Sequence, residues 1–331
     1  MDKYTAIIPV AGSGKRLRPH TYTYPKVLLT VGDKPIIGHI IDKLIKSQIN
    51  DICFVIGYLG DKVKEYVEKN YSDKINASYI FQEEQKGLGH AIWLTRDFVK
   101  GHILIILGDT IIETDIKKFI NTKNAIIGVN EVSDPQRFGI VSIKNGFVYD
   151  MIEKPSNPPT NLAISGVYSF PDSSKLYGAL DLLVNNRRTT KGEIQLTDAM
   201  RIMVKNGYKI KPIKIDGWYD CGKPETLLET NKYILSRNSK KYDFKNCVIV
   251  DPVYISNTAK IENSIIGPYA SIGDGVVIKD SIVSESIINE HATIKCSNLI
   301  KSLIGPYAVV IGRRHSLNVG ENSEIKMSED A

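Results

Sequence analysis

The stretch AIIPVAGSGKRLRPHTYTYPKVL, residues 6–28, decides the fold of the first part of this 331-residue chain. Ile7, Ile8 and Val10 predict a buried parallel strand, and the glycines after it let the backbone approach a ligand and point N–H groups at it. Four cations follow the strand: Lys15, Arg16, Arg18 and Lys26. A strand that ends in such a turn predicts an anion site in an α/β fold, of the kind that binds a polyphosphate.

Two well-known phosphate loops do not match this turn. The P-loop needs GxxxxGK followed by Ser or Thr, whereas Gly12 and Gly14 stand two apart here and Arg16 follows Lys15. The dinucleotide fingerprint GxGxxG also fails, because Leu17 occupies the place of its third glycine. The turn therefore belongs to another class of anion site.

Composition limits the partners and the compartment. The net charge is +6, from 43 basic and 37 acidic residues, which suits small anions and does not demand nucleic acid. The apolar runs are too short for a membrane span, and no signal-peptide pattern opens the sequence. The four cysteines are far apart and form no CxxC pair. We therefore expect a cytoplasmic protein that binds neither nucleic acid nor membrane.

Short apolar segments alternate with amphipathic ones up to about residue 237, which is typical of a mostly parallel sheet covered by helices. We expect strands at residues 5–11, 52–57, 78–82, 103–107, 125–132 and 167–170. We expect helices at residues 36–47, 60–70, 88–99, 173–185, 196–206 and 224–235. The chain is too long for one core, so we predict two domains, residues 1–240 and 241–331.

The second domain has a different period. Apolar residues recur six apart, as at Ile255 and Ile261 or Ile272 and Ile278, with slips of four or five between runs. IIGPYA at residues 265–270 returns as LIGPYA at residues 303–308. A six-residue repeat builds a parallel β-helix, in which three sides make a coil and the isoleucines stack inside; about four coils fit the tail.

The glycine turn resembles the signature of the sugar-1-phosphate nucleotidylyltransferases, roughly GxGTRLxP, then a threonine, KPLLPV and a KP pair. This chain has GSGKRLRP, Thr21, KVLLTV and a KP pair at residues 34–35, and it keeps Arg16 and Lys26. It departs from the signature at Lys15, Val27 and Thr30. Ordered motifs extend the resemblance over residues 3–235, and the repeat tail is similar to that of long-form glucose-1-phosphate thymidylyltransferases.

This resemblance implies a Rossmann-like, mostly parallel sheet in the first domain and a left-handed parallel β-helix in the second, through which subunits commonly associate. It implies a homo-oligomer. The implied reaction moves a nucleoside monophosphate from dTTP or UTP to a sugar 1-phosphate, with glucose 1-phosphate favoured, and releases pyrophosphate. The implied cofactor is Mg²⁺.

By resemblance we assign Asp109 and Asp220 as the metal ligands. Asp109 ends the run ILIILGD, so we expect it at the carboxyl edge of a central strand, where ligands bind in open α/β sheets. Asp220 stands in WYDCG, where the family shows WxDxG. Carboxylates from two segments, completed by phosphate oxygens, suit Mg²⁺.

The catalytic candidates are cations. The attacking sugar phosphate is already an anion, so no general base is needed, and positioning and charge neutralisation carry the reaction. The resemblance implies that Arg16 stabilises the triphosphate and the leaving pyrophosphate, and that Lys26 reaches the α-phosphate. Lys154, in the EKP motif, would hold the sugar phosphate.

The base-reading candidates lie in QEEQKGLGHA, residues 82–91, which resembles the pyrimidine-reading loop of the family. Gln82 and Gly87 would meet the base, and Ala11, Gly12 and Gly14 of the turn are further candidates for binding the nucleotide. Thymine and uracil differ by one methyl, worth roughly 1–3 kcal/mol, so the choice between dTTP and UTP stays open.

The sugar-phosphate site is implied by DPQRFG, EKP, TNLAISGVY and KGEIQLTDA, which start at residues 134, 153, 160 and 191. The candidates are Gly139, Glu153, Asn161 and Gly166.

Two alternatives remain. A bifunctional uridylyltransferase and acetyltransferase acting on amino-sugar phosphates would use a β-helix histidine, His291 or His315. A non-catalytic regulatory relative would keep the fold without turnover, although the intact cations and carboxylates argue against it. A guanylyl- or cytidylyltransferase would be a variant of the leading reading.

Overall fold

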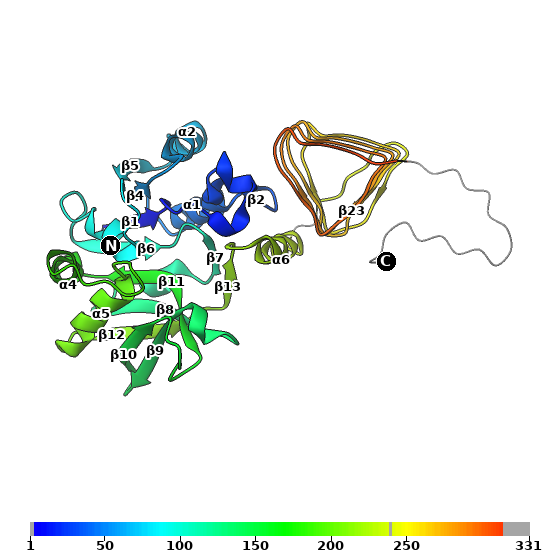
Figure 1. Cartoon of the computed structure of the whole chain (residues 1–331). Helices are drawn as coiled ribbons and strands as arrows, with labels where there is room; N and C mark the ends of the chain where they lie inside the picture. The colour runs from blue at the N-terminus through cyan, green and yellow to red at the C-terminus, as the bar shows by residue number, and fades with distance from the viewer. Residues whose placement is uncertain (1–2, 238–239, 314–331) are drawn as a thin grey trace. The chain divides into compact units, whose positions relative to one another are not determined.

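The structure, a computed structural model, describes residues 3–237 and 240–313. The chain divides into two compact units, Met1–Ile234 and Leu235–Ala331 (Figure 1). The domain boundary that the sequence places after residue 240 stays a prediction. No helix in the described ranges is both long and apolar enough to cross a membrane.

The first unit is built on a nine-stranded Rossmann-like sheet, as predicted. Its main path runs β10-β9-β11-β6-β1-β4-β5, and β8 joins β11 while β12 joins β8. The parallel core strands are β1 (Tyr4–Pro9), β4 (Asp51–Ile56), β5 (Asn76–Phe81) and β6 (His102–Ile106). The remaining strands are β8 (Ala125–Glu131), β9 (Gly139–Lys144), β10 (Phe147–Glu153), β11 (Leu162–Phe170) and β12 (Ile210–Lys214). β11 is antiparallel to β6, β8 and β9, so the sheet is mixed.

Six α-helices accompany this sheet: α1 (Ile36–Lys46), α2 (Gly60–Tyr71), α3 (Leu88–Trp93), α4 (Ser173–Asn185), α5 (Leu196–Lys205) and α6 (Pro224–Leu235). Apolar side chains of α3, α4 and α5 share one buried cluster with residues of the sheet such as Ile7 and Ile105. The predicted helices are confirmed except at residues 94–99, where the prediction was wrong. There the Thr95 hydroxyl donates to the Ile92 carbonyl, and the chain continues as turns.

Two short strands that the sequence did not predict connect distant segments. β7 (Thr110–Glu113) and β13 (Gly217–Asp220) form a separate antiparallel pair. Their register sets Asp220 opposite Thr110, and the N–H of Cys221 donates to the carbonyl of Asp109 at 3.0 Å. The β7–β13 pair thus brings the WYDCG motif beside Asp109.

The second unit contains three parallel four-stranded sheets, consistent with a left-handed β-helix, and Figure 1 shows its coils end-on as a triangle. The sheet that starts the unit has β14 (Val248–Ile249), β17 (Ile265–Ile266), β20 (Ile282–Ser284) and β23 (Asn298–Ile300). The next has β15 (Tyr254–Ile255), β18 (Ser271–Ile272), β21 (Ile287–Ile288) and β24 (Leu303–Ile304). The last has β16 (Lys260–Glu262), β19 (Val277–Lys279), β22 (Thr293–Lys295) and β25 (Val309–Ile311).

The slips in the six-residue period are absorbed at the corners of the coils. Ile265 pairs with Ile282 and Ile282 with Asn298, so successive coils are offset by 17 and then 16 residues. Buried isoleucines such as Ile272 and Ile278 fill the interior, as the period predicts.

The IGPYA repeat marks a corner and not a side of the coil. Ile266 lies in β17, whereas its repeat equivalent Ile304 lies in β24 of the neighbouring sheet. Tyr269 and Tyr307 nevertheless share the left-handed backbone region, with φ of 62° and 60°. The two copies therefore place a tyrosine in the left-handed region at different corners of the coil.

Candidate active site

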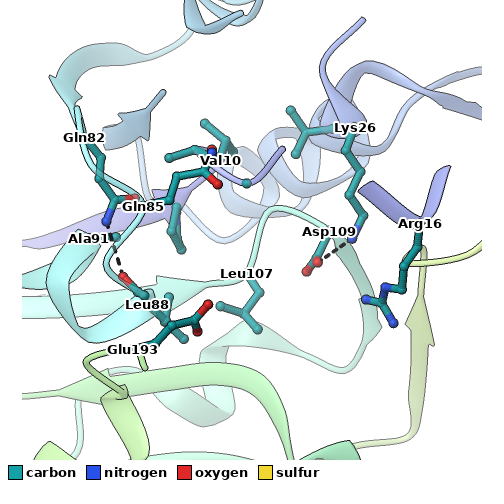
Figure 2. Close-up of a pocket in the computed structure, with 15 residues that line it drawn as sticks. Val10, Arg16, Lys26, Gln82, Gln85, Leu88, Ala91, Leu107, Asp109 and Glu193 are labelled. Carbon is teal, nitrogen blue, oxygen red and sulfur yellow. Dashed lines mark hydrogen bonds and ion pairs between the residues drawn. The ribbon is translucent and has the colours of Figure 1, made fainter. Parts of the chain in front are cut away.

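One cavity of about 430 Å³ collects most of the predicted nucleotide and metal residues. It lies where β1 and β6 end, the edge at which open α/β sheets bind ligands. The predicted residues that line it are Ala11, Gly12, Arg16, Lys26, Gln82, Gly87 and Asp109. Figure 2 shows Gln82 and Gln85 on one side of this cavity and Lys26, Asp109 and Arg16 on the other.

The glycine turn is shaped by Gly14 and Thr21. Gly14 has φ of 61° and starts a 3-10 helix, Lys15–Leu17, which the fully buried Leu17 anchors. The Thr21 hydroxyl donates to the Gly14 carbonyl at 2.8 Å, and a Cβ on Gly14 would come within 2.9 Å of the Thr21 methyl. Gly12 is exposed and nothing lies within 4 Å of where its Cβ would stand, so a ligand can approach its backbone closely.

Lys26 and Asp109 form an ion pair at the cavity wall. Lys26 Nζ lies 2.6 Å from Asp109 Oδ2, and Asp109 Oδ1 accepts from the Thr110 hydroxyl at 3.2 Å. Burial alone would favour the protonated acid, but the charge and hydrogen bond of Lys26 outweigh it and hold the pKa of Asp109 below its ordinary value. The carboxylate is therefore ionised at neutral pH, with its side chain 37% exposed.

Arg16 and Asp220 share the space above Gly222. A Cβ on Gly222 would lie 2.8 Å from Arg16 Nη2 and 2.8 Å from Asp220 Oδ1, so the absence of a side chain lets both groups approach. Asp220 also faces Arg137, whose Nη2 is 3.8 Å from Asp220 Oδ2. Asp220 lines a second cavity of about 330 Å³ together with Arg137 and Trp218, whereas Asp109 lines the first.

The donor set fits a magnesium ion that arrives with a nucleotide. Among residues 3–237 and 240–313, no three His, Cys, Asp or Glu side chains gather as a protein-only metal site. Asp109 and Asp220 instead offer carboxylate oxygens from two paired segments, and phosphate oxygens would supply the remaining hard ligands. The assignment of these two residues to the metal stays a prediction.

Three residues predicted for the sugar phosphate come together around Glu153. Glu153 Oε2 accepts from the Thr197 hydroxyl at 2.7 Å, and Lys154 Nζ lies 3.5 Å from Glu153 Oε1. A Cβ on Gly139 would stand 3.0 Å from Glu153 Oε2, so a larger residue at position 139 would crowd the carboxylate. The Glu153 side chain is only 10% exposed, and these contacts hold it in one place.

Gly166 and Asn161 differ in their surroundings. Gly166 has φ of 79° at a register shift in β11, and its carbonyl accepts from the N–H of Leu107, a residue that lines the larger cavity. Asn161 is exposed just before β11, and its carbonyl accepts from the N–H of Val132. Its side chain does not line either cavity.

The sequence did not single out several residues of the site. Gln85 donates from Nε2 to the Ala11 carbonyl at 2.9 Å and ties the base-reading loop to the glycine turn. Thr197 orients Glu153, and His90 contacts Gln82 behind the cavity. Gln85, His90 and Thr197 lie within the motifs QEEQKGLGHA and KGEIQLTDA, but the sequence of these motifs does not show in which direction the side chains point.

Comparison with known proteins shows the family of the chain. Residues 5–237 match the nucleotidyl transferase family model. The chain is 33% identical to the low-salt glycan biosynthesis nucleotidyltransferase Agl11 of Haloferax volcanii, covering 96% of this chain and 98% of that protein. It is also 33% identical to the bifunctional protein GlmU of Methanocaldococcus jannaschii, over 90% of this chain and 80% of GlmU. A glucose-1-phosphate thymidylyltransferase of Streptomyces griseus is 27% identical, over 98% and 99% of the two chains.

A solved structure has a similar fold over most of this chain. It is described as a glucose-1-phosphate thymidylyltransferase from Bacillus anthracis in complex with sucrose, at 28% identity and a TM-score of 0.63. The match covers 72% of this chain and 98% of that one. The chain therefore belongs to the nucleotidyl transferase family, as a sugar-phosphate nucleotidyltransferase.

Proposed function

We propose that the enzyme transfers a nucleoside monophosphate from dTTP or UTP to glucose 1-phosphate, giving a nucleotide sugar and pyrophosphate. The observation that carries this proposal is the division of the larger cavity: the Gln82 and Gln85 amides stand at one side and the Lys26–Asp109 pair with Arg16 at the other (Figure 2). A nucleotide needs such a division, because its base is read by hydrogen bonds and its phosphates by charge. The names of the Streptomyces griseus and Bacillus anthracis relatives favour glucose 1-phosphate.

The reaction forms one P–O bond and breaks another. A phosphate oxygen of the sugar 1-phosphate attacks the α-phosphorus, and the bond between the α-phosphorus and the bridging oxygen breaks, so that both electrons leave with pyrophosphate. No proton has to move, because the attacking oxygen is already ionised. Arg16 faces the leaving pyrophosphate, and Lys26 compensates the charge that builds on the α-phosphoryl oxygens.

Asp109 and Asp220 would hold the magnesium ion between them and the nucleotide phosphates. The bound ion would neutralise phosphate charge that the two carboxylates would otherwise repel. Besides binding phosphate, Lys26 has a second role: its ion pair keeps Asp109 ionised and in place before the nucleotide binds.

On the sugar side, Glu153 accepts hydrogen bonds from sugar hydroxyls and Lys154 binds the sugar phosphate. The Thr197 hydroxyl uses one acceptor position on Glu153 Oε2, and Lys154 Nζ lies 3.5 Å from Oε1, so each oxygen keeps a further lone pair for the sugar. Gly139 and Gly166 would offer backbone groups to the sugar, and Asn161 would contact it only after a local movement, because its side chain lines neither cavity.

Pyrophosphate release tests the proposal. Purified protein is given glucose, glucosamine, N-acetylglucosamine or mannose 1-phosphate, each with dTTP, UTP, CTP or GTP. We expect the highest turnover with glucose 1-phosphate and dTTP or UTP, and none with Asp109→Ala. A wild type no faster than that variant would show a regulatory relative without turnover, and a preference for GTP with mannose 1-phosphate would refute the base assignment.

The bifunctional alternative is supported by the similarity to the GlmU relative. His291 is exposed at a corner of the β-helix and stacks on Tyr307, with ring centroids 5.0 Å apart, while His315 lies outside the described residues. Release of free thiol from acetyl-CoA in the presence of glucosamine 1-phosphate would support this second activity. No release at any protein concentration would exclude it.

We further propose a cytoplasmic homo-oligomer that associates through the β-helix. Val248, Ile265 and Ile282 are in register on the sheet that contains β14, β17 and β20, and each is at least 39% exposed. A row of exposed β-branched side chains of this kind is typical of a subunit contact. Replacing Ile265 and Ile282 by Glu should reduce the mass seen by analytical ultracentrifugation, whereas an unchanged mass would place the contact elsewhere.

A further inference from the structure

Gln82 and His90 make a buried contact behind the base-reading side of the cavity. Gln82 is 5% exposed and His90 9% exposed. Gln82 Nε2 lies 3.3 Å from the Gly87 carbonyl oxygen and 3.1 Å from His90 Nδ1. A carbonyl oxygen can only accept a hydrogen bond, so the Gln82 atom that faces it must be the NH₂ group. The orientation of this amide is therefore set by chemistry.

The same contact fixes the state of the His90 ring. Because the NH₂ group can only donate, His90 Nδ1 must accept, which requires a neutral ring with its hydrogen on Nε2. Burial and the Lys86 ammonium lower the pKa of His90, and the opposing charge of Glu84 does not restore it. The ring also stacks on Trp93, with centroids 5.7 Å apart and planes inclined by 24°. His90 is thus held neutral and in one orientation.

The remaining group of Gln82 is an acceptor. Both amide hydrogens are used by Gly87 and His90, so Gln82, which lines the cavity, has only its Oε1 to offer a ligand. Uracil and thymine carry a hydrogen on N3 and would donate it to this oxygen. Cytosine has a lone pair on N3, and two acceptors facing each other repel.

We propose that His90 is a positioning residue that fixes the Gln82 amide with its oxygen toward the base, and that this sets the preference for UTP or dTTP over CTP. The proposal rests on the proposed function, since it takes the larger cavity as the nucleotide site. His90 touches no substrate in this role and acts only through Gln82. Without an acceptor at Nδ1, only the 3.3 Å contact with the Gly87 carbonyl opposes a turn of the amide, and the NH₂ group can then face the base.

A pair of variants at position 90 tests the role. In His90→Asn the side-chain oxygen stands where Nδ1 stood and still accepts, whereas His90→Leu has similar bulk and no acceptor. The measurement is kcat/KM for UTP, dTTP and CTP at fixed sugar 1-phosphate, with thermal unfolding as the control for folding. We expect the Leu variant to lose about tenfold of the UTP-over-CTP preference and the Asn variant to keep it. Equal preferences in the two variants would overturn the proposal.

The ring state can be measured on the wild type without turnover. In ¹⁵N-histidine-labelled protein at neutral pH, the spectrum of His90, assigned by its loss in His90→Leu, should show an unprotonated Nδ1 and a protonated Nε2. A hydrogen on Nδ1 would overturn the proposal. If the wild type released no pyrophosphate from any substrate pair, the proposed function would fail, and this spectrum alone would decide on His90.

Discussion

Lys26 Nζ lies 2.6 Å from Asp109 Oδ2, and the Lys26 side chain is only 10% exposed. One residue was predicted as a catalytic cation and the other as a metal ligand, and the structure joins them directly. A lysine so deeply buried needs this partner, because an unpaired charge in such a place is costly. The pair therefore links the phosphate-binding turn to the carboxyl edge of β6.

Lys26→Met should lower kcat/KM by about 10²–10³-fold, the usual loss when one donor to a developing charge is removed. Thermal unfolding should also change, since Asp109 would lose the ion pair that keeps its carboxylate ionised. Lys46→Met, on the exposed face of α1, is the matched control and should leave turnover unchanged. A Lys26→Met enzyme with normal kcat/KM would remove Lys26 from the phosphate site.

Thr197→Val should raise the KM for the sugar 1-phosphate by about tenfold while the KM for the nucleotide stays the same. The valine keeps the shape but cannot donate to Glu153, whose carboxylate then loses its fixed orientation. Thr197→Ser restores the hydroxyl and should restore the KM. A rise in the nucleotide KM instead would show that Thr197 acts on the other substrate.

Gly14→Ala should cost stability and nucleotide affinity together. The alanine would be strained at φ of 61°, and its Cβ would come within 2.9 Å of Thr21 and 3.1 Å of Lys26. Gly101→Ala is the control, because φ there is 81° but nothing lies within 4 Å. Each should lose about 1–2 kcal/mol of unfolding free energy, and only Gly14→Ala should raise the nucleotide KM. Equal kinetics in the two variants would contradict this reading.

Asp150→Asn should lower stability at neutral pH and not at acid pH. Asp150 accepts from Arg201 Nε at 2.8 Å and from Nη2 at 3.1 Å, so although burial opposes ionisation the pKa of Asp150 lies below its ordinary value. A lowered pKa stabilises the fold above the ordinary aspartate value, and that stability is lost as pH falls through the lowered one. Urea unfolding of wild type and variant should differ by about 1 kcal/mol at pH 7, and the difference should shrink as pH falls below the ordinary pKa of an aspartate. A constant difference would exclude this linkage.

The sequence predicts what local pattern controls. The apolar strand before Gly12, Asp109 at a strand end and the isoleucine period of the β-helix each depend on neighbours in the chain, and the structure has all three. Pairing between distant segments produces no local pattern in the sequence. The β7–β13 pair and the contact of Thr197 with Glu153 join residues far apart, and no periodicity announces them.

The direction of individual side chains is the second property that the sequence could not predict. The motif QEEQKGLGHA contains both Gln82 and His90. Their contact depends on the direction in which α3 leaves Gly87, whose φ is 102°, and the sequence does not give that direction. The sequence likewise shows IGPYA twice and cannot say that the copies bend the chain at different corners, because the offset of the coils depends on the slips between them.

The pairing of β13 with β7 has a consequence for how this enzyme is made. Asp220 reaches the neighbourhood of Asp109 only when the segment Gly217–Asp220 docks along Thr110–Glu113. On the ribosome, the glycine turn, Lys26 and Asp109 are all synthesised well before that segment emerges. A nascent chain stopped at residue 216 lacks the carboxylate that we propose as the second metal ligand, so the proposed metal site is completed only when this late segment pairs with β7.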